Sequence, residues 1–156
     1  MNKQEPSWIW RSFEELNKTE LYEILKLRSE VFIVEQECLY QDLDGLDTES
    51  NHLLGLNSDN ILVAYLRLIP PGLKFKEPSL SRIITSEIES YRGVGLGKEL
   101  IARGIKKSID LYPKMGNRIG AQERLKIFYE NLGYQALGPS YIEDGIPHIQ
   151  MFFRND

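Results

Sequence analysis

The chain has 156 residues, a formal net charge of −4 and a pI near 5.3, and 42% of its residues are hydrophobic. This length is enough to bury a full core, so we expect a single domain over residues 1–156. The acidic balance without a basic stripe argues against a nucleic-acid-binding protein, and no apolar run is long enough to cross a membrane. Cys38 is the single cysteine and the first residues do not resemble a signal peptide, which together predict a cytoplasmic protein.

In chain order, the first predicted elements are a strand and a helix. Apolar and polar side chains alternate over residues 8–13, which is typical of a strand. Asn17 fits a helix N-cap with Glu20 three residues later, the pattern of a capping box, and the apolar stripe of this helix continues to Phe32. Alternation and turn residues then predict a hairpin and a further strand, over residues 52–57, 61–68 and 80–85.

The second half of the chain predicts two helices and three strands. A long helix is marked by apolar residues from Leu96 to Ile109 and ends before Pro113. A second helix follows residue 122 and is stopped by Gly133. Strands are predicted at residues 117–122, 134–138 and 147–154. The mixture of helices and strands indicates an α/β or α+β domain with a mixed sheet.

A glycine-rich segment stands between a predicted strand and the long helix. Residues 91–98 read YRGVGLGK, and Gly93, Gly95 and Gly97 each cost about 0.5–1 kcal/mol of helix stability relative to alanine. Exposed amides at the positive end of a helix attract an anion, and glycine lets a phosphate approach them. A P-loop does not fit, because its lysine is followed by serine or threonine whereas Lys98 is followed by a glutamate. The dinucleotide pattern Gly-x-Gly-x-x-Gly does not fit either, because Lys98 stands where its last glycine is required. The alternative to an anion-binding loop is a glycine-rich turn that only allows the helix to pack on the strand.

The pattern that remains is Arg-x-x-Gly-x-Gly, formed by Arg92, Gly95 and Gly97. It resembles the cofactor loop of the GNAT superfamily of N-acetyltransferases. Three further stretches, residues 27–47, 121–134 and 143–151, are similar to the ElaA-like branch of that superfamily. The resemblance implies a GNAT fold, with a mixed, mostly antiparallel sheet flanked by helices. It also implies transfer of an acetyl group from acetyl-CoA to a primary amine of a small molecule or protein.

The resemblance also implies which residues hold acetyl-CoA. In the family, the strand before the loop bonds the pantetheine arm and the loop amides wrap the pyrophosphate. Gln122 matches a position at which the family often has an asparagine in contact with the cofactor, although a simple helix cap is the alternative for this residue. No metal site is predicted. The implied cofactor-binding residues are Ile84, Thr85, Ser86, Arg92, Gly93, Val94, Gly95, Leu96, Gly97, Lys98 and Gln122.

Acetyl transfer from a thioester to an amine requires a proton for the departing thiolate. A phenol suits this role, because it stays protonated at neutral pH and can donate along a hydrogen bond. Tyr129 matches the family position of this acid. The alternative is an aromatic residue of an amphipathic helix, and its neighbour Phe128 is expected in the core.

The general base is left open among several groups. Glu35, His52 and His148 are candidates, and a water chain to a carboxylate would also suffice. The stretch from residue 35 to residue 49 carries six acidic residues and no basic one, which is typical of a solvated loop. A second hypothesis is that it attracts a cationic acceptor, through Asp44 and Asp47. The predicted acceptor-side residues are Glu35, Asp44, Asp47, His52 and His148.

Two other functions fit part of these observations. One is a module that binds acetyl-CoA without turnover. The other is an acyl-transferring synthase, because VFIVEQ followed by an acidic stretch resembles acyl-homoserine-lactone synthases, although the tryptophan usual in that family is absent. Cys38 is interpreted as a buried structural thiol or, alternatively, a nucleophile. GNAT proteins commonly form homodimers in which edge strands of the two sheets pair, so the resemblance is also compatible with a homodimer.

Overall fold

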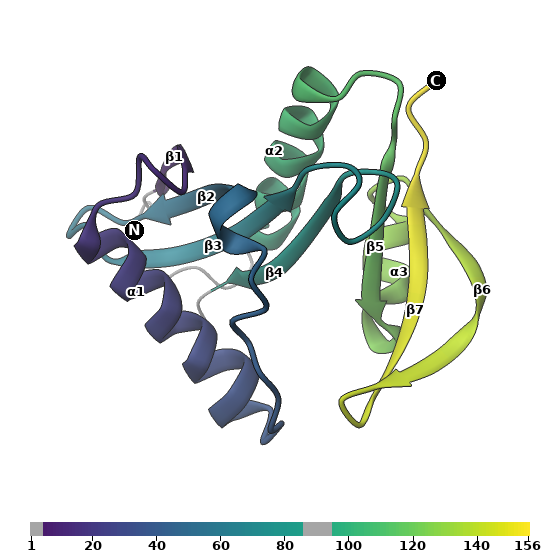
Figure 1. Cartoon of the computed structure of the whole chain (residues 1–156), viewed down its shortest axis with the longest axis horizontal. Helices are drawn as coiled ribbons and strands as arrows, with labels where there is room; N and C mark the ends of the chain where they lie inside the picture. Colours follow the sequence, from purple (N-terminus) through teal and green to yellow (C-terminus); the bar gives the residue numbers. More distant parts are fainter. Residues whose placement is uncertain (1–4, 86–94) are drawn as a thin grey trace.

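The computed structural model describes residues 5–85 and 95–156, and its strands form two antiparallel sheets (Figure 1). The first sheet has the order β1-β2-β3-β4, with bounds Ser7–Ser12, Asn51–Leu56, Leu62–Ile69 and Ser79–Thr85. The second has the order β5-β7-β6, with bounds Asn117–Gln122, Ile146–Phe153 and Tyr134–Glu143. The helices are α1 (Lys18–Arg28), α2 (Leu96–Leu111) and α3 (Lys126–Glu130). A π-helical segment η1 (Ser29–Glu35) and the 3₁₀ turns η2 (Asp47–Glu49) and η4 (Glu123–Leu125) complete the described helical elements.

The α+β fold predicted from the sequence is confirmed, and its sheet is divided between β4 and β5. The two strands start side by side, where the Arg118 N–H donates to the Pro78 carbonyl at 3.0 Å. The Leu80 N–H also donates to the Asn117 side chain at 3.3 Å. From there the strands diverge (Figure 1), and helix α2 makes the connection between them. The result is a V that opens toward the C-terminal ends of β4 and β5.

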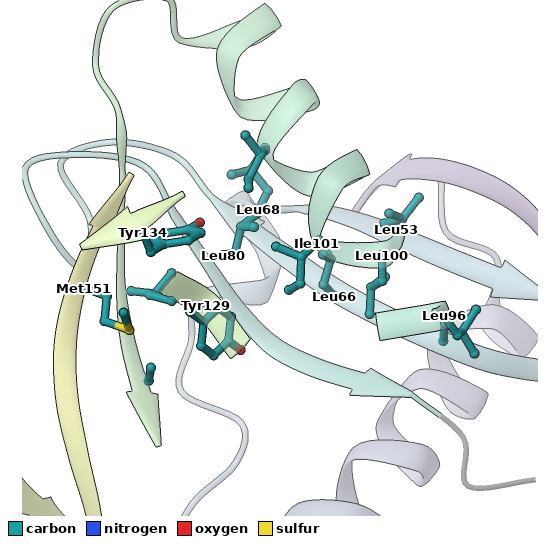
Figure 2. Packing of buried hydrophobic residues seen from close by; sticks show 14 of the residues in the cluster. Leu53, Leu66, Leu68, Leu80, Leu96, Leu100, Ile101, Tyr129, Tyr134 and Met151 are labelled. Carbon is teal, nitrogen blue, oxygen red and sulfur yellow. The ribbon is translucent and has the colours of Figure 1, made fainter. Parts of the chain in front are cut away.

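Helix α2 packs on the first sheet through its apolar face. Leu96, Leu100, Ile101 and Ile105 recur at helical spacing and are buried in one cluster with residues of β3 and β4 (Figure 2). Gly104 is the point of closest approach in this packing. A Cβ atom at that position would lie 2.9 Å from side-chain carbons of Leu66 and Leu80. The helix can therefore lie this close to the sheet only because residue 104 has no side chain.

Replacing Gly104 by valine should destabilise the protein by about 2 kcal/mol, because the added carbons overpack the contact with β3 and β4. The matched control is Ala102→Val on the exposed face of the same helix, which should cost only the helix propensity of valine, about 0.7 kcal/mol or less. Urea denaturation of both variants measures the difference. Equal stabilities would show that the packing relaxes around residue 104.

The start of α1 follows its local sequence. The Asn17 side chain accepts from the Glu20 N–H at 2.7 Å, and the Glu20 carboxylate accepts from the Asn17 N–H at 3.0 Å. The predicted capping box is therefore confirmed. Ile24 packs in a second cluster with residues of β2, β3 and β4. The π-helical segment that continues α1 was not expected from the apolar stripe.

Two predictions for the last third of the chain need correction. The helix expected after residue 122 consists of a 3₁₀ turn and the five-residue α3, and it ends before Gly133, which has φ +105°. Strand β6 was expected to end near residue 138 but continues to Glu143, because its pairing with β7 resumes after a register shift. Within the described ranges, none of the helices combines the length and hydropathy required to span a membrane.

Candidate functional site

A cavity of about 470 Å³ lies between the diverging strands. Residues 79–85 of β4 form one wall, and residues 119–122 of β5 form the other. Gly97 of α2 and the aromatic residues Phe128 and Tyr129 of α3 also line it. The rest of the lining comes from distant segments: Val31, Phe32, Gln36, Cys38, Tyr40, Lys74, Arg124, Leu125, Glu143, Asp144, Ile146 and His148. The lining combines apolar side chains with polar and charged ones, and a cavity of this size suits a small-molecule ligand.

The N-terminus of α2 lies at the edge of this cavity. Gly95 is its N-cap and adopts the left-handed conformation, with φ +71° and ψ 29°. Among the described residues, no atom would lie within 4 Å of a Cβ atom at Gly95. At Gly97 a Cβ would lie 3.6 Å from the Phe128 ring and 3.8 Å from Thr85. The positive end of a sixteen-residue helix therefore lies beside the ends of β4 and α3.

Strand β4 carries a β-bulge where it lines the cavity. Two of its residues, Arg82 and Ile83, stand opposite the single residue Leu66 of β3. Arg82 has φ +52°, a conformation that is uncommon for a residue with a side chain. Its guanidinium donates to the Asp42 carboxylate at 2.7 Å and to the Asp42 carbonyl at 3.0 Å. These contacts hold the bulge, which leaves an extra backbone unit unpaired with β3.

The contacts of Arg82 belong to a larger arginine–aspartate cluster. Three arginines and three aspartates pair with one another: Arg28, Arg67, Arg82, Asp42, Asp44 and Asp47. Arg28 and Arg67 are completely buried. Asp47 accepts from Arg28 at 2.6 Å and from Arg67 at 3.0 Å. Burial alone would raise the pKa of Asp47, but the hydrogen bonds and charges of these arginines outweigh burial and lower it.

This arginine–aspartate cluster corrects the interpretation of the acidic stretch. Asp42 and Asp47 are only 9% and 8% exposed, so the solvated-loop prediction is wrong for both. Asp44 also pairs with Arg67, at 2.8 Å. Within the described chain, neither Asp44 nor Asp47 lines the cavity. Their charges are matched by buried arginines, so they do not form a surface that attracts a cationic acceptor.

Tyr129 lies in the cavity wall between the two sheets. The residue is only 6% exposed, and its ring meets the Phe128 ring edge-on, with centroids 5.3 Å apart. It also meets the Tyr134 ring edge-on, with centroids 5.8 Å apart (Figure 2). Burial raises the pKa of Tyr129 to about 12, so its phenol is protonated at neutral pH. Phe128 was expected in the core, which is wrong: it is 37% exposed and lines the cavity beside Gly97.

The sequence also matches a protein-family model over nearly its whole length. A model described as an acetyltransferase (GNAT) domain matches residues 14–154.

The chain belongs to the GNAT acetyltransferase family.

Relatives within this family match over nearly the whole chain. The UPF0039 protein sll0451 of Synechocystis is 44% identical over 150 residues, which is 96% of each chain. Protein ElaA of Escherichia coli is 38% identical over 92% of this chain and 94% of its own. Its crystal structure matches with a TM-score of 0.87 over 96% of this chain and 99% of that chain. An acyl-CoA N-acyltransferase from Pseudomonas aeruginosa matches at 37% identity and a TM-score of 0.87, over 95% and 99% of the two chains. The predicted ElaA-like resemblance is thus confirmed.

Only some of the residues that the GNAT resemblance assigned to the cofactor line the cavity. Ile84, Thr85, Gly97 and Gln122 line the cavity. The Leu96 side chain is instead buried in the core under α2. Two positions lie at the open start of the helix, the exposed Gly95 and Lys98. Ser86, Arg92, Gly93 and Val94 lie outside the described residues.

Gln122 and His148 come together at one end of the second sheet. They are paired residues of β5 and β7, and both line the cavity. Gln122 is the N-cap residue of η4, but its side chain makes no capping hydrogen bond. The amide instead donates to Gln36 at 3.5 Å, and its oxygen accepts from Arg124 at 3.0 Å. The side chain therefore points toward neighbouring cavity residues, which the simple cap hypothesis did not predict.

Two of the residues proposed as general bases lie elsewhere. His52 is 1% exposed, and its ring nitrogens lie 2.7 Å from the Tyr65 hydroxyl and 2.9 Å from the Asp47 carbonyl. Burial lowers the pKa of His52, which is thus a neutral structural residue. Glu35 ends η1 with an exposed side chain. Neither residue is among the described residues that line the cavity, so the structure does not bring these two predicted acceptor-side residues to it.

Sequence reasoning missed several cavity residues from distant segments. Gln36 and Tyr40 lie in the stretch that resembled the ElaA-like branch, but nothing in their spacing marked them. Lys74 comes from the connection between β3 and β4, and Glu143 is the last residue of β6; only the fold brings them to the cavity. Cys38 is buried, as one of the two interpretations held, and its thiol donates to the Asp144 carbonyl at 3.1 Å. That bond joins the acidic stretch to the β6–β7 turn.

Proposed function

We propose that the protein is an acetyl-CoA-dependent N-acetyltransferase that transfers the acetyl group to a primary amine of a small molecule or protein. The observation that carries this proposal is the cavity between β4 and β5, with the α2 N-terminus at its edge and Tyr129 in its wall. Membership of the GNAT family and similarity to an acyl-CoA N-acyltransferase support it.

The residues around the cavity fit the parts of acetyl-CoA. Strand β4 is the last strand of its sheet, so backbone groups of its cavity-side edge are available to a ligand. The amides of a pantetheine arm can bind such an edge as an added strand would. The pyrophosphate suits the N-terminus of α2, where amides and the helix dipole favour negative charge. Within residues 5–85 and 95–156, no atom would crowd a Cβ atom at Gly95, the N-cap of that helix.

The chemistry follows from the same elements. Backbone N–H groups of the bulge at Arg82 and Ile83 are candidates to stabilise a developing oxyanion, because the bulge frees a backbone unit from pairing with β3. Tyr129 supplies the proton that the departing thiolate needs, since its phenol stays protonated at neutral pH. The arginine–aspartate cluster contributes indirectly, by fixing the bulge through Arg82 and Asp42.

A thiol-release assay with acetyl-CoA and a broad amine panel tests this function directly. We expect release of free thiol only when a suitable amine is present. A protein that binds acetyl-CoA by calorimetry but releases no thiol with any amine would be a binding module. Faster release with longer acyl-CoA donors would favour the synthase alternative.

Gly95→Asn should weaken acetyl-CoA binding at least tenfold, about 1.4 kcal/mol. Asparagine tolerates the left-handed backbone of Gly95, whereas valine would add backbone strain to any effect on binding. The asparagine side chain would lie at the N-cap of α2, at the place where the pyrophosphate is proposed to bind. Isothermal calorimetry measures the affinity.

The matched control is Gly72→Asn, which also replaces a left-handed glycine with open space around it, at φ +88°. Residue 72 is distant in sequence from α2, so the Gly72→Asn protein should bind acetyl-CoA with the affinity of the wild type. Equal weakening in both variants would point to a general effect on stability. Unchanged affinity in a folded Gly95→Asn protein would remove the pyrophosphate from this end of α2.

A further inference from the structure

His148 is held in a fixed position in the cavity wall. It lies on the central strand of the second sheet, opposite Gln122 of β5 and Tyr141 of β6. Its ring stacks on the Tyr141 ring, with centroids 6.0 Å apart and planes inclined by 27°. The side chain is 12% exposed and shares the cavity with Tyr129. The ring is therefore both confined and in contact with the cavity.

A hydrogen bond fixes which nitrogen of His148 carries the proton. Nδ1 lies 2.7 Å from the Ile146 carbonyl oxygen. Because a carbonyl can only accept, Nδ1 must donate, and the neutral ring keeps its lone pair on Nε2. His52 differs, because both of its nitrogens are already engaged by Tyr65 and Asp47. Of these two histidines, only His148 has a ring nitrogen, Nε2, without a hydrogen bond to the described residues.

Nε2 of His148 faces a carboxylate. The Glu143 carboxylate lies 3.6 Å from Nε2, close enough to stabilise the positive charge that the ring gains when it accepts a proton during the reaction. Arg82, which also lines the cavity, is paired with Asp42 and Asp44. The other charged or titratable groups that line the cavity are Cys38, Tyr40, Lys74, Arg124, Tyr129 and Asp144.

We infer that His148 is the general base of the reaction and that Glu143 stabilises the imidazolium it forms. The inference rests on the N-acetyltransferase function proposed above. Nε2 of His148 takes one proton from the ammonium group of the acceptor, directly or through a water molecule. The freed lone pair forms the new C–N bond. The C–S bond breaks as Tyr129 gives its proton to sulfur, and the second amine proton restores Tyr129. His148 returns its proton to solvent, so each acetylation releases one proton.

The decisive experiment compares two probe acceptors in His148→Gln, with free thiol as the readout at neutral pH. Benzylamine is a cation at this pH and must lose a proton, whereas aniline is already neutral. We expect the variant to lose roughly 10²–10⁴-fold in kcat with benzylamine and far less with aniline. Equal losses with both amines would mean that His148 only supports the site, and unchanged rates with both would exclude it as the base.

Two further measurements separate this inference from the proposed function. In the wild type without ligands, long-range ¹H–¹⁵N NMR should show neutral His148 with its proton on Nδ1; a proton on Nε2 would overturn the inference whatever the activity. Glu143→Gln should lower kcat with benzylamine more than with aniline, because the imidazolium formed during the reaction loses its partner. Equal rates of Glu143→Gln and wild type with benzylamine would exclude the role of Glu143. A wild type that releases no thiol with any amine would instead refute the transferase function itself.

Discussion

Replacing Tyr129 by phenylalanine should lower kcat roughly 10²–10⁴-fold while acetyl-CoA still binds with near-normal affinity. Phenylalanine keeps the ring that packs against Phe128 and Tyr134, so the wall of the cavity retains its shape. The only loss is the hydroxyl, which burial keeps protonated at neutral pH. Steady-state kinetics measures the loss in kcat, and calorimetry measures the affinity for acetyl-CoA. We expect kcat to fall while the affinity is retained.

Tyr134→Phe is a matched control for this variant. Tyr134 is as buried as Tyr129, but its hydroxyl donates to Asn117 at 2.8 Å and it is not among the residues that line the cavity in the described structure. We expect it to cost about 1 kcal/mol of stability and to leave kcat nearly unchanged.

The leaving group of the thioester provides a second test of Tyr129. If Tyr129 protonates sulfur, the deficit of Tyr129→Phe should shrink with thioesters whose thiols are more acidic. Those thiols depart without a proton in the transition state. A deficit independent of the thiol would make Tyr129 a positioning group, and near-normal turnover would leave thiolate departure to water.

Features that depend on neighbouring residues could be predicted from the sequence. The capping box of Asn17 and Glu20 is local, and both of its hydrogen bonds are present. The helix after the glycine segment was predicted because its apolar spacing and Pro113 define it within one stretch of chain. The family resemblance added the cavity position of Tyr129, which spacing alone does not distinguish from an ordinary core aromatic.

Features that depend on distant partners could not be predicted. The acidic stretch has no basic residue of its own, so a solvated loop was the natural prediction. Its partners Arg28, Arg67 and Arg82 come from α1, β3 and β4, and only the fold brings them together. The same reason explains His148, because the residues with which it shares the cavity, such as Gln36 and Tyr129, are distant in the sequence and only the fold brings them together.

Asp47→Asn should destabilise the protein by about 3 kcal/mol at neutral pH, since breaking a buried ion pair leaves its partner uncompensated. Asp47 accepts from both Arg28 and Arg67, so the change affects two fully buried guanidinium groups. Glu49→Gln is the control from the same 3₁₀ turn, with an exposed side chain, and should stay within about 0.5 kcal/mol. Urea denaturation at neutral pH measures both.

The pH dependence tests whether the charge of Asp47 causes this loss. The arginines lower the pKa of Asp47 in the folded protein, so its contribution is fully present above the unfolded value, about 4, and is lost as pH falls through the folded value. Asparagine does not titrate, so the stability gap between wild type and Asp47→Asn should narrow as pH drops below about 4. A gap that is constant with pH would mean that shape rather than charge holds the cluster. If the folded variant instead kept its stability and showed only a higher KM for the amine, Asp47 would serve the acceptor, as the second hypothesis for the acidic stretch held.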